Sequence, residues 1–284
     1  MIKVFYNLNY QNGSAPKEAK ITFHTFSGGE EHVNIENFYT HQIEIRADLT
    51  STQEVMRLLL VTDALRRMIH CPPITLHMPY LPYARQDRVC QTGDSFALKV
   101  FCDLINSQKY NKVVISDAHS SVATALLDNV KELKQSRQAF DFTDSYDFII
   151  APDAGACKKA VDFSETVEWD NEVVQALKVR SKDGNITSTK VLYGDFEGKS
   201  CLIVDDICDG GRTFLELAKV LKSQNAGSIA LYVTHGIFSQ GLDVLFEGGI
   251  DFIYTTDSFK QTDSRVKVIP TYSNYLSEQP SQSL

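Results

Sequence analysis

Several features that identify common protein classes are absent from this chain of 284 residues. Its apolar runs fall short of the roughly 20 residues that a membrane-spanning helix needs. The first residues, Met-Ile-Lys-Val-Phe-Tyr-Asn, lack the apolar core of a signal peptide. A net charge of -8 is opposite in sign to the basic surface typical of proteins that bind nucleic acids or anionic membranes. These absences predict a soluble protein that binds neither nucleic acid nor membrane.

No Cys-x-x-Cys spacing occurs among the six cysteines, which stand at positions 71, 90, 102, 157, 201 and 208. Most lie in or beside apolar segments, as reduced thiols do. Reduced cysteines predict a cytoplasmic location. The chain also lacks short-period repeats, and its length with 43% hydrophobic residues predicts two domains.

Apolar strands and amphipathic helices alternate along the chain, which predicts an α/β fold with a mainly parallel sheet. Ligands then bind where the strands end. Ser51 and Glu54 form a capping box at the start of one expected helix. Another helix is expected after Asp94 and a third over 122–133, and strands are expected at 74–78, 113–116, 147–151, 200–204, 228–234 and 251–255.

The most informative segment is 201–213, which reads Cys-Leu-Ile-Val-Asp-Asp-Ile-Cys-Asp-Gly-Gly-Arg-Thr. Its first four residues have the apolar character of a buried parallel strand, and the apolar spacing after Thr213 is helical. A strand that passes through a glycine-rich turn into a helix aims unpaired N–H groups at one spot, where an anion can bind. The three acids would repel a bare phosphate, so sugar hydroxyls or a cation such as Mg2+ are expected beside it. The alternative is a polar loop that only caps a strand.

This segment resembles the ribose-5-phosphate loop shared by phosphoribosyltransferases and phosphoribosyl diphosphate (PRPP) synthetases. In those families two acids bind the ribose hydroxyls, and the following backbone and threonine hold the 5-phosphate. The synthetases usually carry Asp-Thr-x-Gly-Thr, whereas Arg212 occupies a glycine position here, so the loop alone does not choose between the families. The resemblance assigns ribose 5-phosphate to Asp205, Asp206, Asp209, Gly210, Gly211, Arg212 and Thr213.

A second segment, Pro-Tyr-Leu-Pro-Tyr-Ala-Arg-Gln-Asp-Arg at residues 79–88, does distinguish these families. Its prolines fix an extended chain, its aromatic rings offer faces on which a base stacks, and its arginines present fork-shaped donors to phosphate. It resembles the Pro-Tyr-x-Pro-Tyr-Ala-Arg-Gln-Asp signature of PRPP synthetases, which phosphoribosyltransferases lack. The resemblance implies that Arg85, Gln86 and Asp87 bind ATP.

Two expected strands end in acids that also match the synthetase pattern. Asp117 and His119 resemble its Asp-x-His, whose histidine lies by the ATP phosphates and their metal. Asp153 resembles the acid of its Ser-Pro-Asp-x-Gly-Gly, which joins the Mg2+ and ribose site. By this resemblance His119 contacts ATP and takes part in catalysis, and His119 and Asp153 hold Mg2+.

Lys178-Val-Arg180 precedes a polar, glycine-containing stretch that predicts a flexible flap. Taken alone, such a triplet is more often an exposed charged loop. In PRPP synthetases a Lys-x-Arg pair at this point is carried on the catalytic loop. The resemblance therefore assigns Lys178 and Arg180 the stabilisation of charge on the transferred group, because this type of transfer depends on positioning and charge neutralisation.

Two further matches lie near the ends of the resemblance. Thr-Phe-Ser-Gly-Gly-Glu at 25–30 resembles a segment that borders the ATP site of a neighbouring subunit in the synthetase oligomer, which implies ATP contacts by Phe26 and Glu30. Thr-His-Gly-Ile-Phe-Ser at 234–239 resembles a family turn. We interpret that turn as architectural, so His235 is not a catalytic candidate.

The resemblance implies two phosphoribosyltransferase-like domains, each a mainly parallel β-sheet flanked by helices. Residues 1–140 would carry the ATP segment and 141–284 the catalytic and ribose-5-phosphate loops, with the option that the final strand packs back on the first domain. The implied activity transfers the β,γ-diphosphate of Mg-ATP to the 1-hydroxyl of ribose 5-phosphate, giving PRPP and AMP. The implied assembly is a homo-oligomer, either dimer or hexamer.

Two other functions stay open at this point. A phosphoribosyltransferase that consumes PRPP would keep the 201–213 segment but would have no use for 83–87 or Lys178. A catalytically silent regulatory homologue is favoured by departures from the family pattern at Gly28, Ala156 and Arg212. The intact Lys178, Arg180, His119 and Asp153 argue against that silent homologue.

Overall fold

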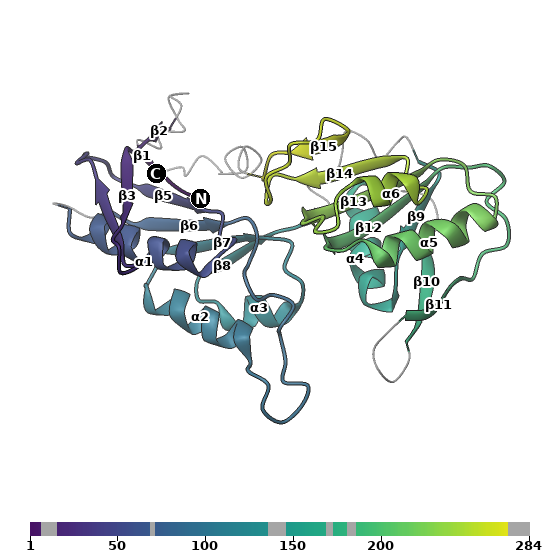
Figure 1. Cartoon of the computed structure of the whole chain (residues 1–284), viewed down its shortest axis with the longest axis horizontal. Helices are drawn as coiled ribbons and strands as arrows, with labels where there is room; N and C mark the ends of the chain where they lie inside the picture. The colour runs from purple at the N-terminus through teal and green to yellow at the C-terminus, as the bar shows by residue number, and fades with distance from the viewer. Residues whose placement is uncertain (7–15, 69–71, 136–145, 169–172, 181–185, 272–284) are drawn as a thin grey trace. The chain divides into compact units, whose positions relative to one another are not determined.

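The computed structural model describes residues 1–6, 16–68, 72–135, 146–168, 173–180 and 186–271. These residues fall into two compact units, Met1–Leu133 and the described part of Lys134–Asn274 (Figure 1). The domain boundary expected at residue 140 lies in 136–145, outside the described residues. That boundary therefore stays a prediction, as does the packing of a final strand on the first domain.

The first unit is built on a six-stranded sheet in the order β2-β1-β5-β6-β7-β8. Strands β5 to β8 are parallel, and β1 is antiparallel to both of its neighbours. The strands are β1 (Ile2–Tyr6), β2 (Lys17–Glu18), β5 (Ile43–Ala47), β6 (Ile74–Met78), β7 (Lys112–Ser116) and β8 (Val130–Leu133). The helices are α1 (Thr52–Arg66), α2 (Ala97–Ser107) and α3 (Ser121–Leu126).

Helix α1 begins where the capping box predicts it. The Glu54 N–H donates to Ser51 Oγ at 3.2 Å, which satisfies one of the free donors of the first turn. Leu58 and Leu65 of this helix are fully buried and join alternate residues of the sheet in one hydrophobic core. In the described part of the chain, no helix combines the length and apolar character that crossing a membrane requires.

The helix expected over 122–133 is wrong beyond Leu126. Asn129 has a positive φ of 53°, and the next residues enter the sheet as β8, parallel to β7. Asparagine adopts this left-handed conformation more readily than most residues, and the Asn129 amide donates to the Tyr110 carbonyl at 3.1 Å. The chain therefore turns back into the sheet where the apolar spacing had indicated a continuing helix.

A separate hairpin, β3 (Ile21–Thr25) and β4 (Glu31–Ile35), lies against α1. Its inward residues pack on the core of the first unit. Arg57 of α1 contacts Glu31 at 2.7 Å and lies over the Phe23 ring, 5.0 Å from its centroid. The hydrogen bond from Arg57 lowers the pKa of Glu31 to about 2, so this carboxylate stays charged and continues to hold the hairpin.

The second unit has a seven-stranded sheet in the order β11-β10-β9-β12-β13-β14-β15. All neighbours are parallel except β10 and β11, which form an antiparallel hairpin. The strands are β9 (Phe148–Ala151), β10 (Val173–Arg180), β11 (Ile186–Val191), β12 (Cys201–Cys208), β13 (Ile229–Gly236), β14 (Phe252–Thr256) and β15 (Val266–Ile269). The helices are α4 (Ala154–Thr166), α5 (Arg212–Ser223) and α6 (Asp243–Glu247).

Both faces of this sheet are covered by helices. Along β12, Ile203 packs in a cluster with α5, whereas Leu202 and Val204 pack in a cluster with α4. Each of these side chains is no more than 1% exposed. A strand buried on both faces needs a continuous apolar sequence, which is the pattern that predicts this strand. The expected α/β fold with mainly parallel sheets flanked by helices is confirmed.

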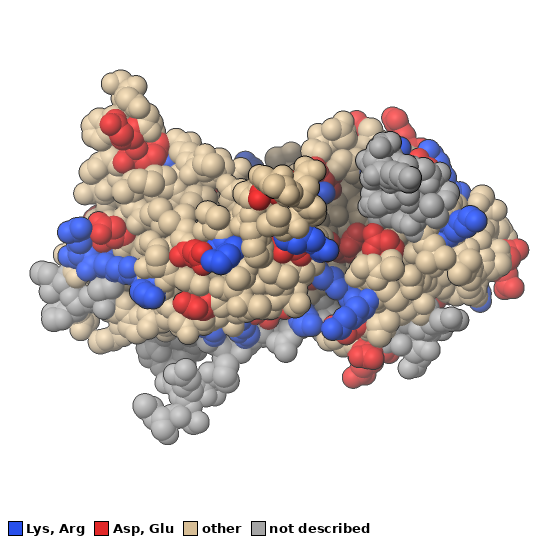
Figure 2. All heavy atoms as spheres, turned by 90° about the horizontal axis from the view of Figure 1, so that it is seen from below, with Lys and Arg blue, Asp and Glu red and all other residues tan. Residues whose placement is uncertain are grey.

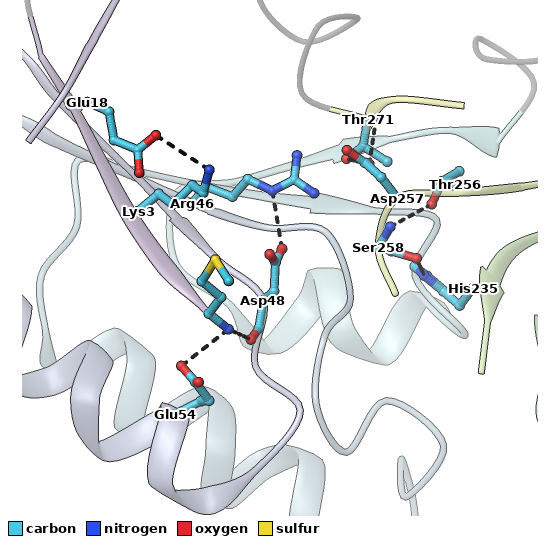
Figure 3. A network of polar contacts seen from close by, with 11 residues as sticks. Lys3, Glu18, Arg46, Asp48, Glu54, His235, Thr256, Asp257, Ser258 and Thr271 are labelled. Carbon is cyan, nitrogen blue, oxygen red and sulfur yellow. Dashed lines mark hydrogen bonds and ion pairs between the residues drawn. The ribbon is translucent and has the colours of Figure 1, made fainter. Parts of the chain in front are cut away.

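The turn after β13 is tightly packed and buried. His235 Nδ1 and Ser258 Oγ are 2.9 Å apart, and the Ser258 N–H donates to Thr256 Oγ1 at 3.2 Å (Figure 3). A methyl group on Gly236 would lie 2.3 Å from the Phe238 ring. His235 is only 2% exposed, so its place in this buried network supports an architectural role.

Replacing Gly236 by alanine is expected to lower the free energy of unfolding by about 1–3 kcal/mol, because the Phe238 ring or β14 has to move. Gly194→Ala is the matched control, since nothing lies within 4 Å of the added methyl group. The control is expected to change the free energy of unfolding by about 0.5 kcal/mol or less. Urea denaturation followed by circular dichroism measures both variants. Equal midpoints would contradict the packing argument.

Candidate active site

Two of the three acids in the 201–213 segment, Asp205 and Asp206, belong to a strand and not to a loop. The sequence places the end of the strand at residue 204, but β12 continues to Cys208 and pairs with β13 as far as Gly236. The Asp206 N–H donates to Asp205 Oδ1 at 2.9 Å, and the Gln135 side chain donates to the Asp205 carbonyl at 2.6 Å. The strand ladder therefore fixes the backbone that carries both acids.

The two neighbouring carboxylates have different surroundings. Lys159 Nζ of α4 lies 3.3 Å from Asp206 Oδ2. Burial of its carboxyl group raises the pKa of Asp205 well above the usual range, with further contributions from Asp206 and Asp153. Carboxyl oxygens gathered at this edge of the sheet suit sugar hydroxyls that donate hydrogen bonds, or a cation.

The turn between β12 and α5 leaves the start of the helix open. Gly211 is the N-cap residue, has a φ of 77°, and has no side chain with which to cap the helix. A methyl group on Gly211 would lie 2.8 Å from Leu245 Cδ2, so glycine is required both for conformation and for space. The Ser239 N–H donates to the Asp209 carbonyl at 3.1 Å and holds the turn from one side. The start of α5 therefore has no side-chain cap, which an anion site of the predicted type requires.

Asp153 occupies the corresponding position before α4, and there it acts as a cap. Its Oδ1 accepts a hydrogen bond from the Ala156 N–H at 3.0 Å. The structure thus gives this predicted metal ligand a structural role in addition to the predicted one. A carboxylate has several acceptor positions, so capping with one oxygen is compatible with contacts to a cation through the other.

Lys178 and Arg180 lie at the end of β10 and not in a loop. Their backbones pair with Thr189 and Ile186 of β11, and a register shift occurs between Val179 and Arg180. The flap expected over 181–187 is therefore a hairpin in part, since its residues 186 and 187 begin strand β11 (Ile186–Val191). The rest of it, 181–185, lies outside the described residues.

In the first unit, the 79–88 segment forms a compact turn. Tyr83 has a φ of 63°, and its ring centroid lies 5.6 Å from that of Phe101 on α2. The Gln86 N–H donates to the Tyr83 carbonyl at 2.8 Å, which closes the turn. Arg85 and Gln86 are exposed. These two predicted ATP contacts are thus accessible to a ligand.

Asp87 of the same segment is buried. Arg88 donates two hydrogen bonds to its carboxylate, at 2.9 and 3.4 Å. These bonds lower the pKa of Asp87 in spite of burial, and the nearby His119 adds to the effect. The structure therefore brings His119 close to the predicted ATP segment. It also shows that Asp87 orients Arg88, which sequence spacing did not indicate.

His119 itself is exposed, at the carboxyl end of β7. Asp117 before it has a φ of 42° and donates its N–H to the Leu133 carbonyl at 2.8 Å. This bend directs the chain out of the sheet and into α3. No group of three or more His, Cys, Asp or Glu side chains suited to a metal ion occurs among the described residues. His119 and Asp153 belong to different units, so their joint role as ligands stays a prediction.

Phe26 and Glu30 lie at the tip of the β3–β4 hairpin. The Phe26 N–H donates to the Glu30 carbonyl at 2.8 Å, and the Phe26 side chain is 51% exposed. Its ring meets that of His24 edge-on, with centroids 4.8 Å apart. An exposed ring held by a rigid hairpin offers a face on which a base can stack.

Charges of both signs are distributed over the surface. On the face drawn in Figure 2, acidic and basic side chains alternate among the described residues. The absence of nucleic acid among the ligands, expected from the net charge of -8, stays a prediction.

The double role of Asp153 leads to a test of stability. Asp153→Asn keeps an oxygen for the Ala156 N–H and is expected to leave the melting temperature nearly unchanged. Asp153→Ala removes the cap and is expected to cost about 1 kcal/mol of unfolding free energy. Thermal and urea denaturation of both variants measure the difference. Equal destabilisation by the two substitutions would contradict the capping role.

Comparisons with known proteins agree with the architecture described above. The model of the N-terminal domain of ribose phosphate pyrophosphokinase matches residues 14–108, and the phosphoribosyl transferase domain model matches residues 122–246. The crystal structure of phosphoribosylpyrophosphate synthetase from Mycobacterium smegmatis superposes with a TM-score of 0.77, at 20% identity, and covers 95% of this chain and 91% of that one.

Curated relatives with the name ribose-phosphate pyrophosphokinase match this chain over most of their length. The ribose-phosphate pyrophosphokinase of Thermosipho africanus is 30% identical over 223 residues, which are 74% of this chain and 68% of the relative. That of Mycoplasma genitalium is 28% identical and covers 86% of this chain and 76% of its own. That of Pyrococcus furiosus is 23% identical and covers 97% of this chain and all of its own. The chain therefore belongs to the ribose-phosphate pyrophosphokinase family.

Proposed function

We propose that this enzyme transfers the β,γ-diphosphate of Mg-ATP to the 1-hydroxyl of ribose 5-phosphate, giving PRPP and AMP. The observation that carries the proposal is the open start of α5 directly after the acid-bearing end of β12. This pairing matches a molecule with a phosphate at one end and hydroxyl groups along its ring. Family membership supports the same substrate class.

The ribose-5-phosphate site would lie in the second unit. The N–H groups of the turn at 209–211 and the first turn of α5 would hold the 5-phosphate, with the hydroxyl of Thr213 and the guanidinium of Arg212 beside them. The carboxylates of Asp205 and Asp206 would accept hydrogen bonds from the ribose hydroxyls. Because the strand ladder fixes both acids, the 1-hydroxyl would be presented in one orientation.

The ATP site would be formed by the exposed groups of the first unit. Arg85, Gln86 and His119 would contact the phosphates, and Asp87 would act through the Arg88 that it holds. Phe26 and Glu30 would reach the ATP of a neighbouring subunit in a homo-oligomer, a dimer or a hexamer. The exposure of the Phe26 ring at a hairpin tip supports that assignment.

The transfer itself depends on positioning and on charge neutralisation more than on a strong base. The ribose 1-hydroxyl would attack the β-phosphorus in line, and AMP would leave. Lys178 and Arg180 would neutralise the charge that develops on the transferred group. Asp153 and His119 would hold Mg2+, which would supply charge neutralisation at the phosphates.

Phosphorus NMR of the protein with Mg2+, ATP and ribose 5-phosphate tests the reaction. The wild type is expected to form PRPP and AMP, and Lys178→Ala to be slower by about 100-fold or more. Lys190→Ala is the matched control, since Lys190 lies on β11 of the same hairpin. This control is expected to keep the wild-type rate.

Two results would contradict the proposal. Equal rates for Lys178→Ala and the wild type would point to a contaminating enzyme. Absence of product from a wild type that still binds PRPP would favour a phosphoribosyltransferase or a regulatory homologue. The exposed Arg85 and Gln86, for which a phosphoribosyltransferase has no use, argue against the first of these alternatives.

A further inference from the structure

A lysine of helix α4, Lys159, contacts one of the acids of β12, Asp206. Lys158 and Lys159 both follow Asp153 in the sequence, and the structure gives their side chains different surroundings. Lys159 Nζ lies 3.3 Å from Asp206 Oδ2, whereas Lys158 is exposed on the same helix. The Lys159 and Asp206 side chains are 27% and 8% exposed, so the pair is largely withdrawn from water.

We propose that Lys159 is a positioning residue, which acts through Asp206 by holding its carboxylate in the orientation that binds a sugar hydroxyl. This inference rests on the proposed function and names a residue that sets the affinity of its sugar site. Asp205 Oδ1 accepts the N–H of Asp206, a residue of the same strand, at 2.9 Å. Asp206 Oδ2 accepts a hydrogen bond from Lys159, a side chain that comes from another element.

The energetics of a buried ion pair support a role beyond folding. Two charges lose their hydration on burial, and their attraction often only compensates for that loss. An apolar pair at the junction of α4 and β12 would therefore serve stability as well or better. What an apolar pair lacks is an acceptor fixed in direction. Fixing that acceptor in advance reduces the entropy lost when a hydroxyl binds.

Lys159 could instead touch the phosphate of the ligand itself. Its Nζ is engaged by a carboxylate of the sugar-binding pair, whereas the proposed phosphate site is the start of α5. We therefore expect the loss of Lys159 to weaken binding of the sugar and to leave binding of the phosphate unchanged. This difference separates positioning from direct binding in an experiment.

Calorimetric titration with ribose 5-phosphate, and with inorganic phosphate as a competitor, tests the proposal on the full-length protein. Lys159→Met removes the charge and keeps a similar volume. It is expected to raise the Kd for ribose 5-phosphate by about 10-fold, the loss of one charge-assisted hydrogen bond, and to leave competition by phosphate unchanged. Lys159→Arg is expected to restore the affinity to within about 3-fold. Lys158→Met is the matched control and is expected to bind as the wild type does.

Kinetics and a double substitution sharpen the same test. KM for ribose 5-phosphate is expected to rise in Lys159→Met, with kcat and KM for ATP unchanged. The reason is that binding of the sugar is weakened equally in the ground state and in the transition state. In an Asp206→Asn background, Lys159→Met is expected to add less than about 2-fold to the loss, because Lys159 acts through Asp206. If Lys159→Met does not fold, Lys159→Gln takes its place in every comparison.

Several outcomes would overturn the proposal. Equal affinity of Lys159→Met and the wild type for ribose 5-phosphate would remove the role of Lys159 and leave the proposed function intact. Equal losses for ribose 5-phosphate and phosphate would make Lys159 a direct phosphate contact. Additive losses in the double substitution would separate Lys159 from Asp206. Failure of the wild type to bind ribose 5-phosphate would overturn both this inference and the proposed function.

Discussion

Burial of β12 between two layers of helix is the constraint on which the second unit depends. Charges cannot be placed where both faces of the strand are covered, so residues 201–204 are apolar and the acids come only after them. Asp205 stands where that burial has not fully ended, and its raised pKa is the result. Because pairing with β13 continues to Cys208, the acids keep the rigidity of the sheet as well. A site that has to orient hydroxyl groups benefits from this rigidity.

The starts of α4 and α5 show how one kind of helix terminus serves two purposes. Asp153 satisfies a donor of α4 with its own side chain, and the helix is closed to an anion. Gly211 has no side chain for α5, and the left-handed turn brings the backbone close to Leu245. Both helices follow strands of the same parallel sheet, so their starts lie at the same edge. The choice of N-cap residue thus decides which helix start can receive a phosphate.

Local chemistry in the sequence predicted much of this arrangement, and contacts between distant segments escaped it. The continuous apolar run of β12 and the capping box at Ser51 were sufficient to place their elements. The helix expected over 122–133 was wrong beyond Leu126, because the backbone becomes extended at Leu127 and Asn129, with a positive φ, leads it into β8. The contact between Lys159 and Asp206 joins residues 47 positions apart on different elements, which no local spacing reveals. The roles of the site side chains also depend on contacts between distant segments, and they stay predictions.

In the proposed site, Asp153, Asp205 and Asp206 would lie near a phosphate, and the pairing of Lys159 with Asp206 would reduce the repulsion between them. Asp153, Asp205 and Asp206 would together repel an anion, yet the open start of α5 attracts one. One lysine neutralises the acid whose carboxylate it orients, and the remaining charge lies on the side of the sugar hydroxyls. The edge of the sheet is then divided into an acceptor-rich part and a donor-rich part. The proposed ligand, with hydroxyls at one end and phosphate at the other, would fit that division in only one direction, so the charge pattern would set its orientation.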